Sequence, residues 1–249
     1  MVPLLRGALA TMVSGLAVTA ALPVAAAGGD AGTLSLRLQQ ALNADDRLEA
    51  LSTLMAPEQA TTLIERFRRF SLRFPETRWA VRPGRALEDG RPTVQLAVSG
   101  TRQQDGLSYS FQAQQRVALS TDQGLITGQE ILSDQSVLTS ARQPVPISLL
   151  IPDTVLTGSR YDVDVVVDQP LGRALLAGGL IAVTPQQVLT QFSPDIQLEP
   201  LGGGGLFKSV QAPFQPGTQT WAALLVHPDG VITVSKRVQV VDDQTQLKP

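Results

Sequence analysis

Few side chains in this sequence could carry acid–base or nucleophilic chemistry. His227 is the single histidine and cysteine is absent, which excludes thiol nucleophiles, zinc knuckles, iron–sulfur clusters and a histidine metal centre. A Ser-His-Asp triad would have to use His227, which lies in a predicted turn beside Pro228, and there is no Gly-x-Ser-x-Gly motif. We therefore expect no catalytic residue, no cofactor and no metal site.

A small group of side chains could still form a ligand pocket. Trp79, Tyr109 and Phe111 are the aromatic residues outside the long predicted helix and the C-terminal half. Together with Glu130 or Asp134 they could bind or isomerise an apolar ligand. Tyr109 alone would be a poor base near neutral pH, because the reference pKa of tyrosine is about 10. The alternative is that these rings simply fill a core.

Arginines between residues 66 and 91 form the sharpest charge feature. They predict a surface for an anionic partner, such as a phospholipid face or an acidic protein. The alternative is a solvated helix face followed by a loop. The candidates for this surface are Arg66, Arg69, Arg73, Arg78, Arg82 and Arg85.

Two other patterns favour ordinary structural roles. Asp162 and Asp164 alternate with valines, so both carboxylates are expected to point to solvent from one face of a strand. A calcium site needs six to eight oxygens from converging loops, which this strand does not supply. The glycine run 202–205 lacks the Gly-Lys-Ser/Thr of a phosphate loop and is expected to connect strands.

The first 27 residues predict a secretory signal peptide. A single Arg6 precedes an apolar stretch from Ala8 to Val24, and Ala25 and Ala27 fit the small-residue cleavage rule. The alternative is an uncleaved membrane anchor, since about 17–25 apolar residues can span a bilayer. We expect export to the periplasm or another extracytoplasmic compartment, with membrane contact only through this segment if it is retained.

Residues 33–139 change from a helical period to a strand period. Leucines at three- and four-residue spacing predict helices over 34–42 and 48–55. A third helix should begin at Pro57 and end before Pro75, with the face Ala60, Leu63, Ile64, Phe67, Phe70 and Phe74. Beyond Gly90 alternating residues predict antiparallel strands over 94–98 and 107–119, with hairpin turns at 104–106 and 121–124. The fold class expected here is α+β, with helices packed on a curved antiparallel sheet.

The order of these segments resembles a known family. Leu51-Ser52-Thr53-Leu54-Met55-Ala56-Pro57-Glu58, a strand ending in Gly100, a long aromatic-bearing strand and Gly124-Leu125-Ile126 before Ser133-Asp134 are similar to the nuclear-transport-factor-two-like cone. That family includes polyketide cyclases and ketosteroid isomerases beside many non-catalytic binding modules. The resemblance implies a sheet that curls around a pocket, and it transfers no catalytic residue to this chain.

Residues 144–241 predict an all-β sandwich. Pro144 and Pro146 mark a boundary, after which charge falls and β-branched residues become frequent. The layout resembles an immunoglobulin-like domain without a disulfide, and 242–249 is expected to be a flexible tail. The expected strands are 147–151, 161–167, 180–183, 196–198, 206–211, 220–227 and 231–241.

Composition completes the functional expectation. Hydrophobic residues make up 43% of the chain and the net charge is −2, so a globular protein without general attraction to nucleic acid is expected. We interpret the chain as an exported, two-domain, non-enzymatic binding or assembly module whose partner is a small apolar ligand or a protein. The alternatives are an isomerase or cyclase-like enzyme in the cone, and a surface-associated factor that uses the arginines.

We predict that the exported chain begins near Gly28, because the small-residue exit follows the apolar stretch directly. Intact mass spectrometry of the exported protein checks this. A mass that retains residues 1–27 would contradict cleavage and favour a membrane anchor.

Overall fold

The structure is a computed structural model that describes residues 31–104, 106–141, 145–168, 176–184, 187, 195–201, 203–228 and 230–247. The expected signal segment, the turn residues Asp105 and Asp229 and the boundary residue Pro144 lie outside the described residues. The helices are α1 (Ala31–Asn43), α2 (Arg47–Ser52) and α3 (Pro57–Arg73), followed near the C-terminus by the 3-10 helix η2 (Gln244–Leu247). No described helix combines the length and the apolar character needed to cross a bilayer.

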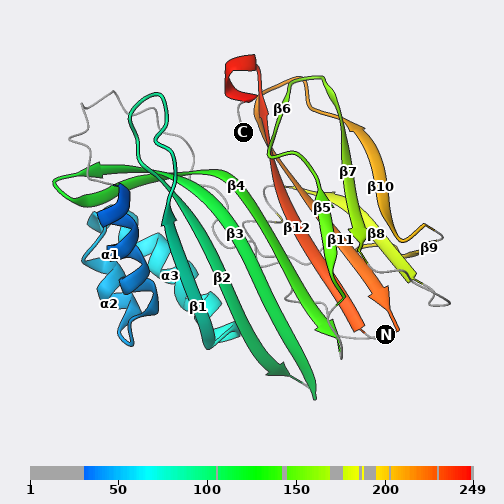
Figure 1. The fold of residues 1–249 in the computed structure, drawn as a ribbon, viewed down its shortest axis with the longest axis horizontal. Coiled ribbons are helices and arrows are strands. Elements are labelled where there is room, and N and C mark those ends of the chain that lie inside the picture. The colour runs from blue at the N-terminus through cyan, green and yellow to red at the C-terminus, as the bar shows by residue number, and fades with distance from the viewer. Residues whose placement is uncertain are drawn as a thin grey trace. The chain divides into compact units, whose positions relative to one another are not determined.

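The rest of the described chain is mostly antiparallel β-structure (Figure 1). The strands are β1 (Glu76–Pro83), β2 (Thr93–Gln104), β3 (Leu107–Asp122), β4 (Leu125–Ala141), β5 (Ile147–Leu150), β6 (Thr154–Leu156), β7 (Arg160–Val167), β8 (Leu176–Val183), β9 (Glu199–Leu201), β10 (Gly205–Gln211), β11 (Gly217–His227) and β12 (Gly230–Val241). Hydrogen bonding among the described residues gives one large sheet in the order β1-β2-β3-β4-β12-β11-β8-β9, with β6 added in parallel to β12. A small sheet has the order β10-β7-β5.

The chain forms two compact units that share β3 and β4. Among the described residues, the first unit contains those in the ranges 31–102 and 112–132, and the second contains those in the ranges 103–111 and 133–247. The strand β4 therefore begins in the first unit and ends in the second.

In the first unit, helices pack on one face of the strands. The apolar stripe predicted for α3 is confirmed, because Ala60, Phe67 and Phe70 are buried. Pro57 starts the helix and Phe74, before Pro75, ends it, as the sequence predicts. The turn predicted at 121–124 is also confirmed, with positive φ at Gln123 and Gly124 as a tight hairpin requires.

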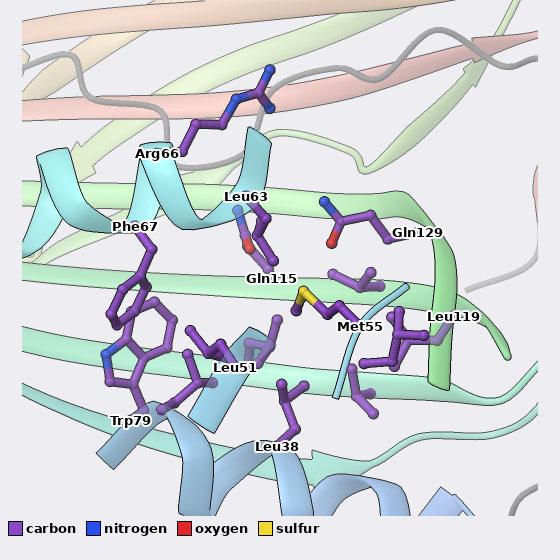
Figure 2. Close-up of a pocket in the computed structure, with 15 residues that line it drawn as sticks. Leu38, Leu51, Met55, Leu63, Arg66, Phe67, Trp79, Gln115, Leu119 and Gln129 are labelled. Atoms are coloured by element: carbon purple, nitrogen blue, oxygen red, sulfur yellow. The ribbon is translucent and has the colours of Figure 1, made fainter. Parts of the chain in front are cut away.

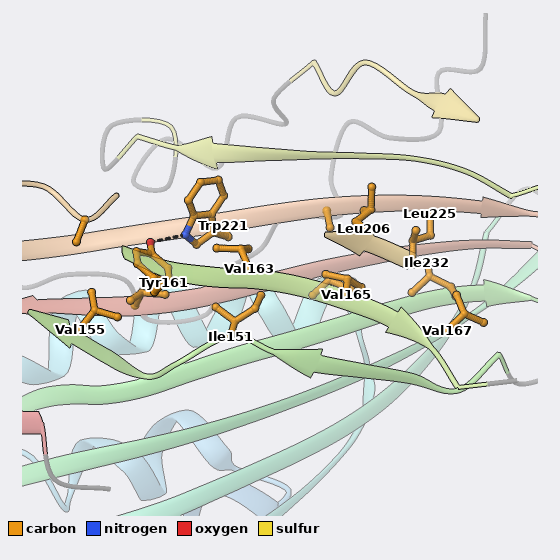
Figure 3. Close-up of a cluster of buried hydrophobic side chains, with 14 of the residues drawn as sticks. Ile151, Val155, Tyr161, Val163, Val165, Val167, Leu206, Trp221, Leu225 and Ile232 are labelled. Carbon is orange, nitrogen blue, oxygen red and sulfur yellow. Dashed lines mark hydrogen bonds between the residues drawn. The ribbon is translucent and has the colours of Figure 1, made fainter. Parts of the chain in front are cut away.

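In the second unit, the small sheet packs on the strands β11 and β12 (Figure 3). Val163 and Val165 of β7 are fully buried, Asp162 before them is exposed and Asp164 between them is half-buried, so the predicted alternation is confirmed. Trp221 Nε1 donates to the Tyr161 hydroxyl at 2.9 Å, and that hydroxyl donates to Gln219 Oε1 at 2.6 Å. The two large polar rings are thus satisfied inside an apolar core.

Three strands differ from the sequence expectation. β1 occupies residues that were expected to form a loop, and β6 was not expected. The strand expected at 196–198 is wrong, because pairing with β8 begins only at Glu199. Residues 196–197 instead cross over Gly179 so closely that a Cβ there would lie 2.1 Å from the carbonyl oxygen of Gln197.

The strand β4 extends past the residues expected to close the first half. Its residues Asp134–Ala141 pair with Gly230–Arg237 of β12, within one compact unit. The boundary predicted at Pro144 and Pro146 therefore comes after β4, and the end of β4 pairs with β12 in the second unit.

We predict that Gly179→Ala destabilises the protein by about 1–3 kcal/mol, the usual cost of overpacking. The added Cβ would meet backbone at 2.1 Å and Ile196 Cγ2 at 2.5 Å, so the segment must shift. Chemical unfolding measures the change in the free energy of unfolding.

Gly217→Ala is the matched control, because a Cβ at this strand glycine meets no atom within 4 Å. Equal unfolding free energies for the two variants would contradict the close approach.

Candidate functional site

An apolar hollow lies in the first unit, between the helices and the strands β1 to β4 (Figure 2). Its volume is about 70 Å³, and it is partly open. Its lining side chains are Leu38, Leu42, Leu51, Met55, Leu63, Arg66, Phe67, Trp79, Val94, Leu96, Gln115, Val117, Leu119, Ile126 and Gln129. The lining is mostly hydrophobic with few polar groups, as in small-molecule sites, but the volume is well below the range of about 300–1,000 Å³ that is usual for such sites.

Aromatic rings close one end of the hollow. The ring centroids of Phe67 and Trp79 lie 5.8 Å apart, and Phe70 packs edge-on against Trp79 at 5.9 Å. Phe74 extends this cluster at 5.4 Å from Phe70. Trp79 is only 8% exposed, and its indole nitrogen has no hydrogen-bond acceptor among the described residues. Ring packing therefore shapes this end of the hollow.

Side chains of α1 hold the outer edge of β1. The side-chain amide of Asn43 donates to the carbonyl oxygen of Trp79 at 2.9 Å and accepts from the Trp79 N–H at 3.0 Å. Gln39, one helical turn earlier, accepts from the N–H of Val81 at 2.8 Å. Arg47 continues the series by donating to Thr77 Oγ1 at 3.0 Å. Three backbone groups of this edge, at Trp79 and Val81, are thereby hydrogen-bonded without another strand.

The segment between α2 and α3 closes the hollow from another side. Met55 forms a parallel bridge with Ile126. The Ala56 N–H donates to the Ile126 carbonyl at 2.9 Å, and the Ile126 N–H donates to the Leu54 carbonyl at 2.8 Å. These bonds place Met55 beside the start of β4, where its side chain enters the hollow (Figure 2).

Three polar residues line the hollow. Gln115 is buried on β3, Gln129 comes from β4 and Arg66 comes from α3. Burial lowers the pKa of the Arg66 guanidinium below its ordinary value, and the positive charge of Arg69 lowers it further. Arg66 is the single charged side chain of the lining.

The six arginines expected to form an anionic-partner surface are divided between two faces. Arg66, Arg69 and Arg73 lie at helical spacing on α3, and burial, then Arg102 and Arg69, lowers the pKa of Arg73. Arg78 and Arg82 are exposed and alternate with the buried Trp79 and Val81, so they project from the opposite face of β1. Arg85 follows in the loop after β1 and is exposed.

Of the five residues expected in a ligand pocket, Trp79 lines the hollow and the other four do not. Tyr109 and Phe111 are buried on β3 but lie in the part of the strand that belongs to the second unit. Asp134 is buried on β4 and pairs in register with Arg237 of β12.

Glu130 is held in an ion pair. Its Oε2 lies 2.8 Å from Nη1 of Arg91, whose Nε lies 2.6 Å from Oδ2 of Asp89. Burial alone would lower the pKa of Arg91, but its hydrogen bonds and ion pairs with Asp89 and Glu130 raise it above its ordinary value. The carboxylate of Glu130 is thus engaged at the surface rather than directed into the hollow.

The other residues that the sequence analysis considered, Asp162 and His227, lie on paired strands of the second unit. The Ser209 hydroxyl donates to Asp162 Oδ1 at 2.6 Å across β10 and β7. His227 ends β11 opposite Gly230. Within the described ranges, histidine, aspartate and glutamate side chains do not gather in a group of three that could hold a metal ion.

Comparison with known proteins adds one finding. Residues 142–241 match a family described as "Domain of unknown function (DUF8623)". The match begins after the end of β4 and finishes at the end of β12, so it covers the C-terminal part of the chain and not the hollow. No curated protein matches the chain.

The sequence reasoning missed most of the lining, because leucines at helical spacing do not distinguish a hollow from a filled core. Two signals were available. Arg66 lies three residues after Leu63 and four before Phe70, at the border of the apolar stripe of α3. Gln115 occupies an inward position between Ala113 and Val117. Polar residues within or beside an apolar stripe indicate where polar side chains line a hollow.

We predict that Asn43→Ala lowers the free energy of unfolding by about 1–3 kcal/mol, since two hydrogen bonds to the Trp79 backbone are lost at about 0.5–1.5 kcal/mol each. Chemical unfolding monitored by circular dichroism measures it.

Gln40→Ala, at an exposed position of the same helix, controls for helix propensity and should be close to neutral. An Asn43 variant as stable as the Gln40 variant would show that the edge contact adds nothing.

Proposed function

We propose that the protein is an exported, non-enzymatic binding module whose hollow in the first unit takes a small apolar ligand. The observation that carries this proposal is the lining itself, which is apolar apart from Arg66, Gln115 and Gln129. Burial of apolar surface is the main driving force that such a site offers, at about 25 cal/mol per Å². Export is supported by the sequence of residues 1–27 alone.

We further propose a finer description of the fold. Residues 33–139 form a cone similar to the nuclear-transport-factor-two-like family, and residues 144–241 form an immunoglobulin-like sandwich. Three helices followed by the antiparallel strands β1 to β4 support the first assignment. A core shared by the small sheet and the strands β11 and β12 supports the second.

The absence of an acid or base among the lining residues favours binding over catalysis. General acid–base work needs a titratable group within hydrogen-bond reach of the substrate. The lining contains no aspartate, glutamate or histidine, and Glu130 is paired with Arg91. The isomerase or cyclase alternative therefore has no proton acceptor at the place where the ligand would lie.

The surface-associated alternative has weaker support than the hollow. An anionic partner would meet Arg66, Arg69 and Arg73 on α3, but Arg78 and Arg82 project from the other face of β1. One flat partner cannot contact both groups at once, so the arginines do not form one extended surface.

The proposal predicts that Leu63→Trp weakens binding of a neutral apolar probe, 1-hexanol, by about tenfold or more. The indole would fill the hollow and displace about two buried methylenes, each worth about 0.8 kcal/mol. Chemical-shift titration of the ¹⁵N-labelled protein measures the Kd.

Leu72→Trp is the matched control, because Leu72 lies on the same helix and is 78% exposed. If 1-hexanol fails to shift resonances of the lining residues in the unaltered protein, the binding proposal is wrong. Turnover of a steroid- or polyketide-like ketone by the purified protein would instead support the enzyme.

A further inference from the structure

We propose that the strand β10 pairs through its free edge with the same strand of a second copy of this chain. This surface lies in the second unit, and it depends neither on the hollow nor on a ligand. β10 is at one end of the small sheet, whose order is β10-β7-β5 (Figure 1). Pairing of two such strands would join the two small sheets into one continuous sheet.

The backbone groups of β10 point alternately toward β7 and away from it. The N–H of Val167 donates to the Gly204 carbonyl at 2.8 Å, and the N–H of Ala212 donates to the Ser159 carbonyl at 2.8 Å. Both bonds fit the antiparallel register of β10 and β7, so the even-numbered residues between them bond to β7. The residues whose N–H and C=O groups point to the free edge are Gly205, Phe207, Ser209 and Gln211.

β10 is the least protected strand edge in the described part of the chain. No described residue hydrogen-bonds to its outward backbone groups. The edge of β1 is bonded in part by side chains of α1, β6 and β9 have only three residues each, and β5 has four and follows Pro146. β10 has seven residues and no proline. Short length, proline and covering elements normally keep edge strands from pairing, so β10 remains open to another strand.

An exposed aromatic ring lies beside these backbone groups. Phe207 is 60% exposed, and Lys208 and Ser209 after it are exposed too. Successive side chains of a strand point to opposite faces, so the exposure of three consecutive residues means that the centre of β10 is uncovered on both faces. An open edge with exposed apolar surface favours strand pairing.

One antiparallel register makes two copies of β10 complementary. In this register Phe207 lies opposite Phe207 of the second copy, and Gly205 lies opposite Ser209 in both directions. These pairs exchange about six backbone hydrogen bonds. Two aromatic rings on the same face form a stabilising cross-strand pair, and the small residues around them leave room. The ring of Phe207 already lies over Gly205, where an added Cβ would be 3.1 Å from Cζ of Phe207.

The charge of Lys208 selects this register over the neighbouring ones. A register shifted by one residue sets Lys208 directly opposite Lys208 of the second copy, and like charges in this position destabilise a strand pair. A further shift sets Phe207 opposite Gln211 and separates the two rings. In the register with paired rings Lys208 faces Leu206, and its ammonium group lies 5.7 Å from the centroid of the Trp221 ring.

The acidic side chains of the small sheet do not oppose pairing. Asp162 and Asp164 lie on β7, one strand in from the edge. Across the joined sheet they would be three strand spacings, at least about 14 Å, from their counterparts. At that distance their repulsion is largely screened at physiological salt.

The interface is small, so the dimer is weak. One strand pair buries less than the roughly 1,200 Å² at which stable interfaces begin. Sedimentation equilibrium of the exported protein between about 10 µM and about 1 mM tests for the dimer. We expect a monomer at the low end of this range and a growing share of dimer toward the high end.

A proline in β10 should block the pairing without breaking the sheet. Ser209→Pro removes an N–H that faces the free edge and leaves the bonds to β7, and proline is tolerated at such positions of edge strands. Because one N–H is lost from each copy, we expect the dimer Kd to rise by about tenfold or more. Ser209→Ala is the matched control, since it also removes the hydroxyl that donates to Asp162 at 2.6 Å but keeps the N–H.

A charge at the centre of the pair should act in the same way. Phe207→Lys replaces the two facing rings with two like charges, so the Kd should rise by about five- to tenfold. Phe214→Lys is its matched control, because Phe214 is 79% exposed and lies outside the strands. It should leave the Kd unchanged.

Single cysteines test the register, since the chain has no cysteine of its own. Phe207→Cys should give a disulfide-linked dimer on oxidation, because the facing Cα atoms would be about 5.5 Å apart. Gln211→Cys should not, because its counterpart would be about 27 Å away along the strands.

A monomer at every concentration would overturn this inference. A dimer that neither Ser209→Pro nor Phe207→Lys weakens would place the contact on another surface and would also overturn it. So would a chain that stays monomeric and instead adds an extended peptide of another protein at β10. If Ser209→Pro fails to fold, as circular dichroism would show, Phe207→Lys and the two cysteine variants decide.

Discussion

The hydrogen bonds between α1 and the outer edge of β1 are the constraint on which the first unit depends. Gln39 and Asn43 lie one turn apart and meet the backbone of Val81 and Trp79, which are two residues apart. A helix rises about 6 Å over four residues and a strand nearly 7 Å over two, so the two spacings match. This match fixes the direction of the helix along the strand, and it carries Leu38 and Leu42 into the wall of the hollow.

Helices and strands with a strong periodic pattern could be predicted from the sequence. Strands that form only because distant residues hydrogen-bond to them could not. The stripe of α3 and the alternation of β7 each bury one face, so period and fold agree. β1 has only Trp79 and Val81 on its buried face, set among arginines that also suit a loop. What makes these residues a strand is an edge completed by Gln39 and Asn43, a long-range contact that local pattern does not contain.

The candidate site was predictable only in part for the same reason. Aromatic scarcity drew attention to Trp79, which lines the hollow. The same reasoning chose Tyr109 and Phe111, which share the correct face of β3 but lie further along it, in the other unit. Alternation assigns a side chain to a face and gives no position along the strand relative to the helices. Because β3 is long and runs from Leu107 to Asp122, residues on the same face can lie in different units.

A hollow persists here because backbone and amide hydrogen bonds, together with the packed rings of Phe67 and Trp79, hold its walls in place. Collapse of the leucines into an apolar volume of about 70 Å³ would recover at most about 2 kcal/mol, at about 24 cal/mol per Å³ for an enclosed cavity. Collapse would require α1 to leave the edge of β1, or Met55 to break its bridge with Ile126. Each step would break hydrogen bonds worth about 0.5–1.5 kcal/mol apiece. Breaking two or more of them would cancel most or all of the gain, so the hollow is retained.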